Sequence, residues 1–170
     1  MNGHNESISE PAAPRADRPH IPGYGIPEDR KGILPWSHAV ERLEGSQNYW
    51  VATTDPDGQP HTVAVWGVWV EGALSFGGGP ETRWSRNLAR NPTVAVHLES
   101  GEDVVILEGT VDRVTDPSDP RMARIDDAYE AKYEMRHGPP IWILRPRVAF
   151  GWNPFGKTAT RWRFADPGRG

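Results

Sequence analysis

The chain lacks cysteine entirely among its 170 residues. This absence excludes disulfide bonds, thiolate metal sites, iron–sulfur clusters and a cysteine nucleophile. Lysine is scarce as well, because only three of the 19 basic residues are lysines, at positions 31, 132 and 157. The arginine bias suits forked contacts with phosphate or carboxylate, and a GC-rich genome would produce the same bias.

Long apolar runs are also missing from the sequence. No segment is long enough to span a bilayer, and the first residues lack the apolar core of a signal peptide. The net charge of -4 is too mild to favour nucleic acid as a partner. We therefore expect a cytoplasmic protein without a membrane span or a nucleic-acid partner.

The length suits one domain with tails. Residues 1–30 are polar and rich in proline and glycine, which predicts a disordered or loosely draped arm. We expect the folded domain to cover residues 31–166 and a short tail to cover residues 167–170. A helix is predicted from Trp36, where apolar residues recur on one face until Gly45.

Strand patterns follow this helix and are separated by hairpin turns. "DPDG" at 55–58 and Glu71-Gly72 mark the first two turns, and a bend is expected at Gly109. Two further helices interrupt the strands, one capped by Thr82 and one capped by Asp119. This order favours a mainly β, α+β fold, namely an antiparallel barrel with helices at its ends. The predicted strands are residues 48–55, 60–70, 73–76, 93–99, 103–114, 142–153 and 158–164, and the later helices are residues 82–90 and 118–135.

Eight tryptophans stand out in this composition. Tryptophan buries a large area, so core and dimer-interface packing explains each one. A flat aromatic wall for a planar ligand is the alternative, and the sequence leaves both open. Six lie in or beside apolar segments: Trp66, Trp69, Trp84, Trp142, Trp152 and Trp162.

The stretch "GGGPETRWSRNLARNP" at residues 77–92 is the first candidate for chemistry. Backbone N–H groups at a helix start favour an anion, and Arg83 and Arg86 would add charge-assisted bonds to a phosphate. The spacing matches neither the P-loop nor the dinucleotide fingerprint. A flexible strand-to-helix turn with a solvated basic face therefore remains an equal alternative.

The histidines show no metal-ligand spacing, so no metal site is predicted. No Gly-x-Ser-x-Gly elbow is present to support a hydrolase. No catalytic residue can be assigned from the sequence. Tyr49, His61 and His97 are candidate proton donors only if they line the pocket.

Taken together, "NYWVATTDPDGQPHTVAVWGVWVEGALSF", "GPETRWSRNLARNPTVAVHLES", "DVVILEGTVDRV" and "TATRWRF" resemble the pyridoxamine 5'-phosphate oxidase-like split-barrel family. They are most similar to its actinobacterial flavin/deazaflavin oxidoreductases that use coenzyme F-420. The resemblance implies a six-stranded split barrel and a homodimer with the cofactor between subunits. The partner subunit would contribute Trp152 or the region of Arg161 and Trp162. By resemblance, the cofactor-binding residues are His61, Val65, Trp66, Phe76, Gly77, Thr82, Arg83, Trp84, Arg86 and Asn87.

One position departs from the family pattern. Relatives commonly read "TRKARNL" where this chain has Trp84 in place of the lysine. An indole cannot neutralise a phosphate, so the departure disfavours tight binding of flavin mononucleotide (FMN). The first expectation is hydride transfer between coenzyme F-420 and a small, flat, apolar substrate. The alternatives are an FMN-dependent pyridoxamine phosphate oxidase-like enzyme, and a non-catalytic cofactor- or haem-binding split-barrel protein.

Overall fold

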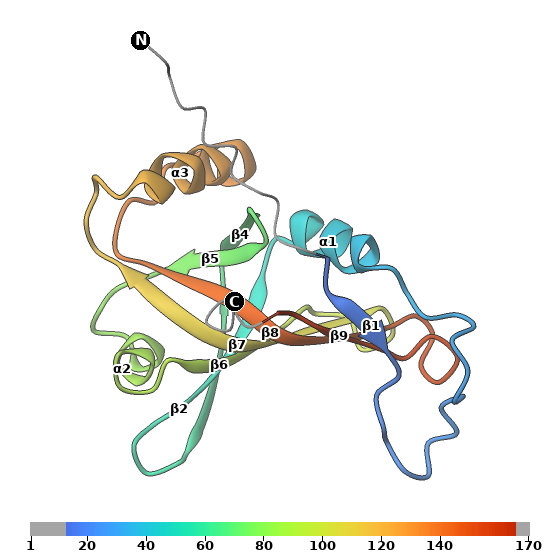
Figure 1. Cartoon of the computed structure of the whole chain (residues 1–170). Coiled ribbons are helices and arrows are strands. Elements are labelled where there is room, and N and C mark those ends of the chain that lie inside the picture. Colours follow the sequence, from blue (N-terminus) through green and yellow to red (C-terminus); the bar gives the residue numbers. More distant parts are fainter. Residues whose placement is uncertain (1–12, 166–170) are drawn as a thin grey trace.

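The computed structural model describes residues 13–165, which build one antiparallel sheet and three helices (Figure 1). The helices are α1 (Trp36–Gly45), α2 (Arg83–Arg90) and α3 (Pro120–Tyr133). The strands are β1 (Arg15–Asp17), β2 (Tyr49–Thr54), β3 (Pro60–Val65), β4 (Gly67–Val70), β5 (Ala73–Gly77), β6 (Thr93–His97), β7 (Val104–Val114), β8 (Ile141–Trp152) and β9 (Thr160–Arg163).

The strand order is β1-β9-β8-β7-β6-β2-β3, and β5 joins β4 to the start of β8. All pairs are antiparallel, so the split-barrel fold class predicted from the sequence is confirmed. The sheet does not close, because β3 pairs only with β2 and β4 only with β5 within residues 13–165. It has 9 strands, more than the resemblance implied.

The continuous strand expected over residues 60–70 is wrong, because the chain breaks at Trp66 into β3 and β4. Gly67 is the first residue of β4 and directly follows this break. A Cβ added there would lie 3.1 Å from the carbonyl oxygen of Ser75 and 3.2 Å from the ring of Tyr49. Periodicity cannot report this corner, since the apolar pattern continues through it.

Other local predictions are confirmed. Thr82 accepts a hydrogen bond from the Ser85 N–H at the start of α2, and Asp119 caps α3 with Pro120 in its first turn. At the expected bend at Gly109, the pairing of β7 with β8 shifts register, with Arg147 of β8 as the extra residue, and a Cβ on Gly109 would collide with the carbonyl of Arg145. Each of these features depends on one residue and its immediate neighbours.

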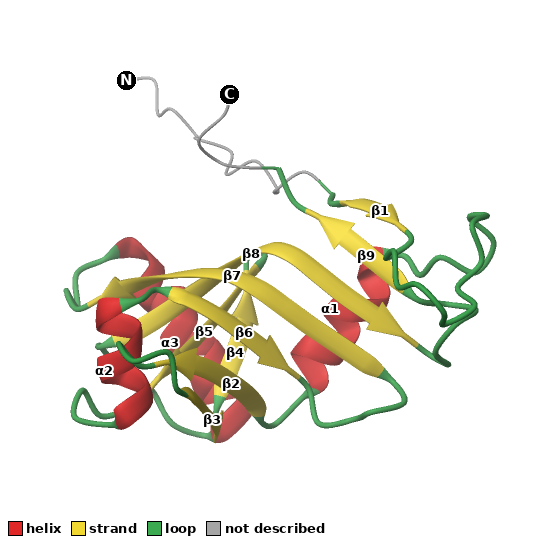
Figure 2. Ribbon diagram, turned by 90° about the horizontal axis from the view of Figure 1, so that it is seen from below, coloured by secondary structure: helices red, strands yellow, loops and turns green. Residues whose placement is uncertain are grey.

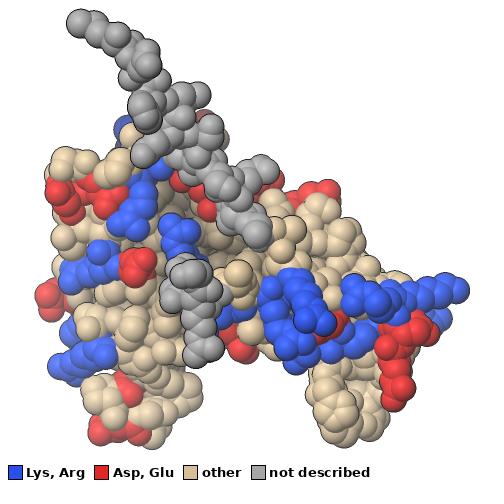
Figure 3. Space-filling model, viewed as in Figure 1, with Lys and Arg blue, Asp and Glu red and all other residues tan. Residues whose placement is uncertain are grey.

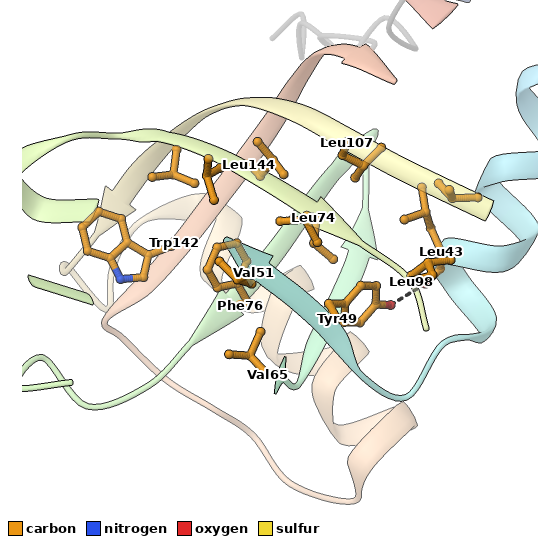
Figure 4. Close-up of a cluster of buried hydrophobic side chains, with 14 of the residues drawn as sticks. Leu43, Tyr49, Val51, Val65, Leu74, Phe76, Leu98, Leu107, Trp142 and Leu144 are labelled. Atoms are coloured by element: carbon orange, nitrogen blue, oxygen red, sulfur yellow. Dashed lines mark hydrogen bonds between the residues drawn. The ribbon is translucent and has the colours of Figure 1, made fainter. Parts of the chain in front are cut away.

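Side chains from both halves of the sheet fill the barrel. Figure 4 shows Leu43, Tyr49, Phe76, Leu107 and Leu144 directed toward one another between the strands. A second cluster lies beneath α3, where its apolar stripe packs on β4, β5 and β8. The predicted stripe is confirmed for Met122, Ile125 and Tyr129, whereas Tyr133 is only half-buried.

Part of the segment predicted to be an arm lies within the described residues and contacts the sheet. β1 pairs with β9, and the guanidinium of Arg18 donates to carbonyl oxygens of Lys157 at 3.0 Å and Ala159 at 2.9 Å. It also donates to Asp29 and Lys31 of its own segment. Residues 1–12 and the tail expected at 167–170 lie outside the described residues.

One face of the large sheet carries no helix. In Figure 2, which views the molecule from below, β6, β7 and β8 lie in front while α1 and α3 lie behind them. The register places Trp50, His97, Ile106 and Phe150 side by side in one row across β2, β6, β7 and β8. We call this helix-free side the outer face.

Candidate functional site

The glycine run before α2 encloses an indole. Trp84 is only 5% exposed, and its ring centroid lies 5.8 Å from that of Phe76. A Cβ on Gly78 would lie 2.6 Å from Cζ2 of Trp84, closer than real contacts allow. Gly78 is therefore needed to let the backbone pass over the indole, and Trp84 belongs to the core.

Other members of the predicted cofactor set share this buried position. The side chains of Val65, Phe76 and Asn87 are buried as well. The Nδ2 atom of Asn87 donates to the hydroxyl of Thr53 at 3.0 Å, which ties α2 to β2. These side chains shape the wall behind the site from within the barrel.

The two predicted arginines of α2 are exposed but occupied. An Nη2 atom of Arg83 lies 3.2 Å from Oδ2 of Asp55 in the β2–β3 turn. Arg86 donates through Nη1 to the carbonyl of Glu81 at 2.6 Å, and the Thr82 hydroxyl donates to Gly79 at 2.9 Å. A phosphate at this helix start would therefore compete with local acceptors.

Asp55 is the main competitor for Arg83. Hydrogen bonding from the Gln59 backbone, and then from the Arg83 guanidinium, holds the pKa of this carboxyl below its usual range. Asp55 is therefore ionised at neutral pH, and it offsets part of the positive charge. His61 lies half-buried on β3, directly opposite Thr53.

Trp66 is the exposed aromatic side chain of the predicted set. It is 50% exposed, and its indole stacks on Tyr133 with the planes 3° apart and the centroids 4.6 Å apart. The Tyr133 hydroxyl accepts from the Gly67 N–H at 3.0 Å, and its single O–H is shared between the carbonyls of Gln47 and Gly67, each 2.8 Å away. The Tyr129 hydroxyl donates to the carbonyl of Trp66 at 3.1 Å.

Lys132 completes the support of this corner from α3. Its ammonium donates to the Tyr49 hydroxyl at 2.8 Å and to the Gly67 carbonyl at 3.1 Å. It also lies 4.9 Å from the ring of Tyr49 and 5.4 Å from that of Tyr133. Burial lowers the pKa of Lys132 to about 8 and raises the pKa of Tyr49 far above its ordinary value. We call Trp66, Gly67, Tyr129, Lys132 and Tyr133 the Trp66 corner.

Gly77, another predicted residue, lies close to this corner. The imidazole of His137 occupies the space into which a side chain at position 77 would project. The ring is 5.0 Å from Tyr129, and its Nδ1 lies 2.8 Å from the carbonyl of Gly138. The structure thus gathers Trp66 and Gly77 around the end of α3, and leaves Arg83 and Arg86 at the start of α2.

The α3 residues were not predicted as site residues. Tyr129 and Tyr133 fit the spacing of a buried stripe, so the sequence assigned them to the core. One signal was present, because the stripe changes from aliphatic to aromatic toward its end, with Lys132 beside it. That change does not show which strand the aromatic residues face.

The candidate proton donors have different surroundings. Tyr49 is fully buried, and its hydroxyl donates to the carbonyl of Leu43 (Figure 4). His97 lies on the outer face and is parallel to Trp50 at 6.3 Å. Of the residues expected to serve the partner subunit, Trp162 is fully buried, whereas Trp152 is half-buried beside Phe155.

Two grooves cross the outer face. The first has a volume of about 320 Å³ and is lined by residues such as Ala52, Ala95 and Glu108. The second, of about 510 Å³, is lined by Arg145 and Arg163 among others, and Arg147 borders both. None of the predicted cofactor residues lines either groove. Between residues 13 and 165, no three histidine or acidic side chains gather to hold a metal ion, and no helix is long and apolar enough to cross a membrane.

The family is shown by a match between residues 36–153 and the model described as pyridoxamine 5'-phosphate oxidase. The match extends from α1 to the end of β8, and so includes the Trp66 corner and the start of α2. The chain belongs to the pyridoxamine 5'-phosphate oxidase family. No curated protein matches the chain.

Solved structures share the fold at low sequence identity. A conserved hypothetical protein from Mycobacterium tuberculosis is 21% identical, with a TM-score of 0.62, over 74% of this chain and 88% of that one. A haem-binding protein from Mycobacterium smegmatis is 21% identical, with a TM-score of 0.59, over 75% and 58%. A putative pyridoxamine 5'-phosphate oxidase from Listeria innocua is 19% identical, with a TM-score of 0.55, over 69% and 97%.

Proposed function

We propose that the protein is an oxidoreductase that transfers a hydride between coenzyme F-420 and a small, flat, apolar organic substrate. The exposed indole of Trp66, backed by Tyr133 and adjacent to Gly77, is the observation that carries the proposal. A rigid aromatic face suits the stacking of a planar ring system. The deazaflavin ring supplies the hydride chemistry when bound, and the protein supplies binding and orientation.

Arg83 and Arg86 are the groups that would meet the cofactor phosphate. Both guanidinium groups are exposed on the first turn of α2, and the capping geometry of Thr82 orders that turn. Charge-assisted bonds from arginine to phosphate are stronger than neutral ones. Because Asp55 already pairs with Arg83, the net attraction for a phosphate is smaller than two free arginines would provide.

The surroundings of Trp66 favour an apolar substrate. Two of the three N–H groups of the Lys132 ammonium donate to Tyr49 and Gly67, so this cation is directed at protein acceptors. Tyr49 is buried and engaged, so it is not available as a proton donor. If hydride transfer leaves a product that needs a proton, the proton would come from water or from a group bound beside the cofactor ring.

We further propose that the protein is a homodimer with the cofactor between subunits, and that the outer face contributes to the interface. The helix-free sheet leaves Trp50, Ile106 and Phe150 partly uncovered. Figure 3, which views the molecule from the side and not onto the outer face, shows basic side chains over β8, β9 and β1, and acidic side chains at the end of the β2–β3 hairpin. Arg147 borders both grooves of this face, whereas Arg163 is already paired with Asp17. A two-fold pair would use the same surface on both copies.

An FMN-dependent oxidase or reductase is the second candidate, and membership of the pyridoxamine 5'-phosphate oxidase family favours it. The two candidates differ in the phosphate site. Tight FMN binding would require Arg83 and Arg86 to neutralise the phosphate without a lysine at position 84. A flavin that copurifies with the protein would identify this candidate directly by its yellow colour.

The test is equilibrium binding of coenzyme F-420 and of FMN to cofactor-stripped protein, followed by quenching of tryptophan fluorescence. Binding of coenzyme F-420 at least about tenfold tighter than FMN, a difference of about 1.4 kcal/mol, supports the first candidate. The reverse order supports the FMN enzyme. Failure of both to bind contradicts the proposal and favours a non-catalytic, cofactor- or haem-binding role.

A further inference from the structure

Lys132 differs from the other two lysines of the chain in its surroundings. Lys31 and Lys157 are exposed, whereas Lys132 is half-buried between two phenol rings. Within the described residues, no carboxylate forms an ion pair with its ammonium. Its hydrogen-bond acceptors are a tyrosine hydroxyl and a backbone carbonyl. The half-buried position of this ammonium is therefore not explained by a counter-ion, and its hydrogen bonds need another explanation.

Lys132 contacts the backbone at Gly67, where the chain breaks between β3 and β4. α3 supplies a partner to each backbone polar group identified at the break. Tyr129 binds the carbonyl of Trp66, Tyr133 binds the N–H of Gly67, and Lys132 with Tyr133 binds the carbonyl of Gly67. The orientation of the Trp66 indole therefore depends on contacts made by one end of α3.

We propose that Lys132 is a positioning residue, whose ammonium fixes the carbonyl of Gly67 and thereby holds the Trp66 indole flat for stacking with the ring of the ligand. This inference rests on the proposed function, in which Trp66 forms the ring-binding wall. Lys132 itself does not touch the ring. It acts through Gly67 and through the ring of Tyr133, against which Trp66 stacks.

Loss of the Lys132 proton would weaken this support. A neutral amine makes weaker hydrogen bonds than an ammonium and no cation–π contact. The titratable groups that surround it are Tyr49 on β2, Tyr129 and Tyr133 on α3, and Glu44 at the end of α1 near Tyr49. The tyrosines have raised pKa values and the pKa of Lys132 is lowered to about 8, so we expect Lys132 to change charge near pH 8.

The test measures the dissociation constants of coenzyme F-420 and FMN from pH 6.5 to pH 9.5 in wild type, Lys132→Arg and Lys132→Met. Lys157→Met is the control, because it removes an exposed lysine from the loop between β8 and β9. In wild type and in the control, we expect ring affinity to fall about fivefold to tenfold with a midpoint near pH 8. Lys132→Arg should keep its affinity across this range, and Lys132→Met should be weak throughout with no midpoint.

A second readout requires no ligand. The near-ultraviolet circular dichroism of the stacked Trp66 and Tyr133 should change near pH 8 in wild type and should be altered in Lys132→Met at every pH. The Trp66→Phe variant identifies which part of the signal belongs to this pair. Identical pH profiles of ring binding and of this signal in wild type and Lys132→Met would overturn the proposal. If no ring binds to wild type, the proposed function fails, and the dichroism still decides whether Lys132 fixes the indole.

Discussion

Trp66 and Trp84 show how differently one residue type can be used within the same candidate site. Trp84 is 5% exposed beneath the glycine turn, and Trp66 is 50% exposed at the strand break. The first is enclosed by Phe76 and the backbone of Gly78, and the second is backed on one face by Tyr133. The comparison shows that an enclosed indole fills the core, whereas an indole packed on one face leaves its other face for a ligand.

The same comparison separates the two halves of the proposed cofactor site. The start of α2 provides positive charge from Arg83 and Arg86 over a filled core. The Trp66 corner provides a flat surface over a set of polar contacts from α3. Binding of the phosphate and binding of the ring should therefore respond to different substitutions.

The largest expected effect distinguishes the two tryptophans by stability. Trp84→Ala should lower the free energy of unfolding by about 3–5 kcal/mol, because it leaves a cavity in the core. Trp66→Ala should cost about 0.5–1.5 kcal/mol, since only its stacking on Tyr133 is lost. Urea denaturation of both variants measures the difference. Equal losses of stability would contradict the assignment of Trp84 to the core and of Trp66 to the surface.

The next effect concerns the glycine turn. Gly78→Ala should destabilise the protein by about 1–3 kcal/mol, because its Cβ overlaps the indole of Trp84. Gly79→Ala is the matched control, since a Cβ there would lie 3.8 Å from its nearest neighbour, a methyl group of Thr82. Thermal melts of the two variants should differ clearly. A Gly78→Ala protein as stable as wild type would mean that the turn does not hold the indole.

A third effect acts on ligand affinity at the start of α2. Arg83→Ala should weaken binding of coenzyme F-420 by about 1.5–3 kcal/mol if the guanidinium bonds to the phosphate. Asp55→Asn should strengthen binding slightly, because it releases Arg83 from an exposed ion pair. Arg90→Ala, in the last turn of α2, is the control. Unchanged affinity in Arg83→Ala would remove Arg83 from the site.

The smallest effect is a pH dependence confined to the Trp66 corner. The pKa of Lys132 is about 8 in the folded protein, below its ordinary value of 10.5, so the unfolded chain binds more protons between these values. The contribution of Lys132 to stability should therefore rise as the pH increases from 8 toward 10.5. Over this range, the melting temperature of wild type should rise relative to that of Lys132→Met. Parallel curves would contradict the lowered pKa.

The sequence predicted features that depend on a single residue and its neighbours. The cap at Thr82, the start of α3 at Asp119 and Pro120, and the bend at Gly109 follow from local backbone chemistry. The split-barrel class followed from the order of elements and from the family resemblance. The buried stripe of α3 followed from helical spacing.

Features that depend on contacts between distant segments were missed. β1 pairs with β9 at the other end of the chain, and no local pattern in Arg15–Asp17 indicates a strand. The break at Trp66 and the contact of Lys132 with Tyr49 depend on how α3 lies over β4. Trp84 belongs to the core because Phe76 and the backbone of Gly78 enclose its indole. The order of residues along the sequence does not reveal this enclosure.

The most direct test of the central claim is the affinity of the Trp66→Ala protein for coenzyme F-420, measured beside wild type by equilibrium dialysis. Removal of a stacking aromatic face should weaken ring binding by about 1–3 kcal/mol, or about fivefold to 150-fold. A circular dichroism spectrum and a urea midpoint close to those of wild type would show that the fold is intact. Wild-type affinity in a folded Trp66→Ala protein would contradict the account, because the ring would then bind elsewhere.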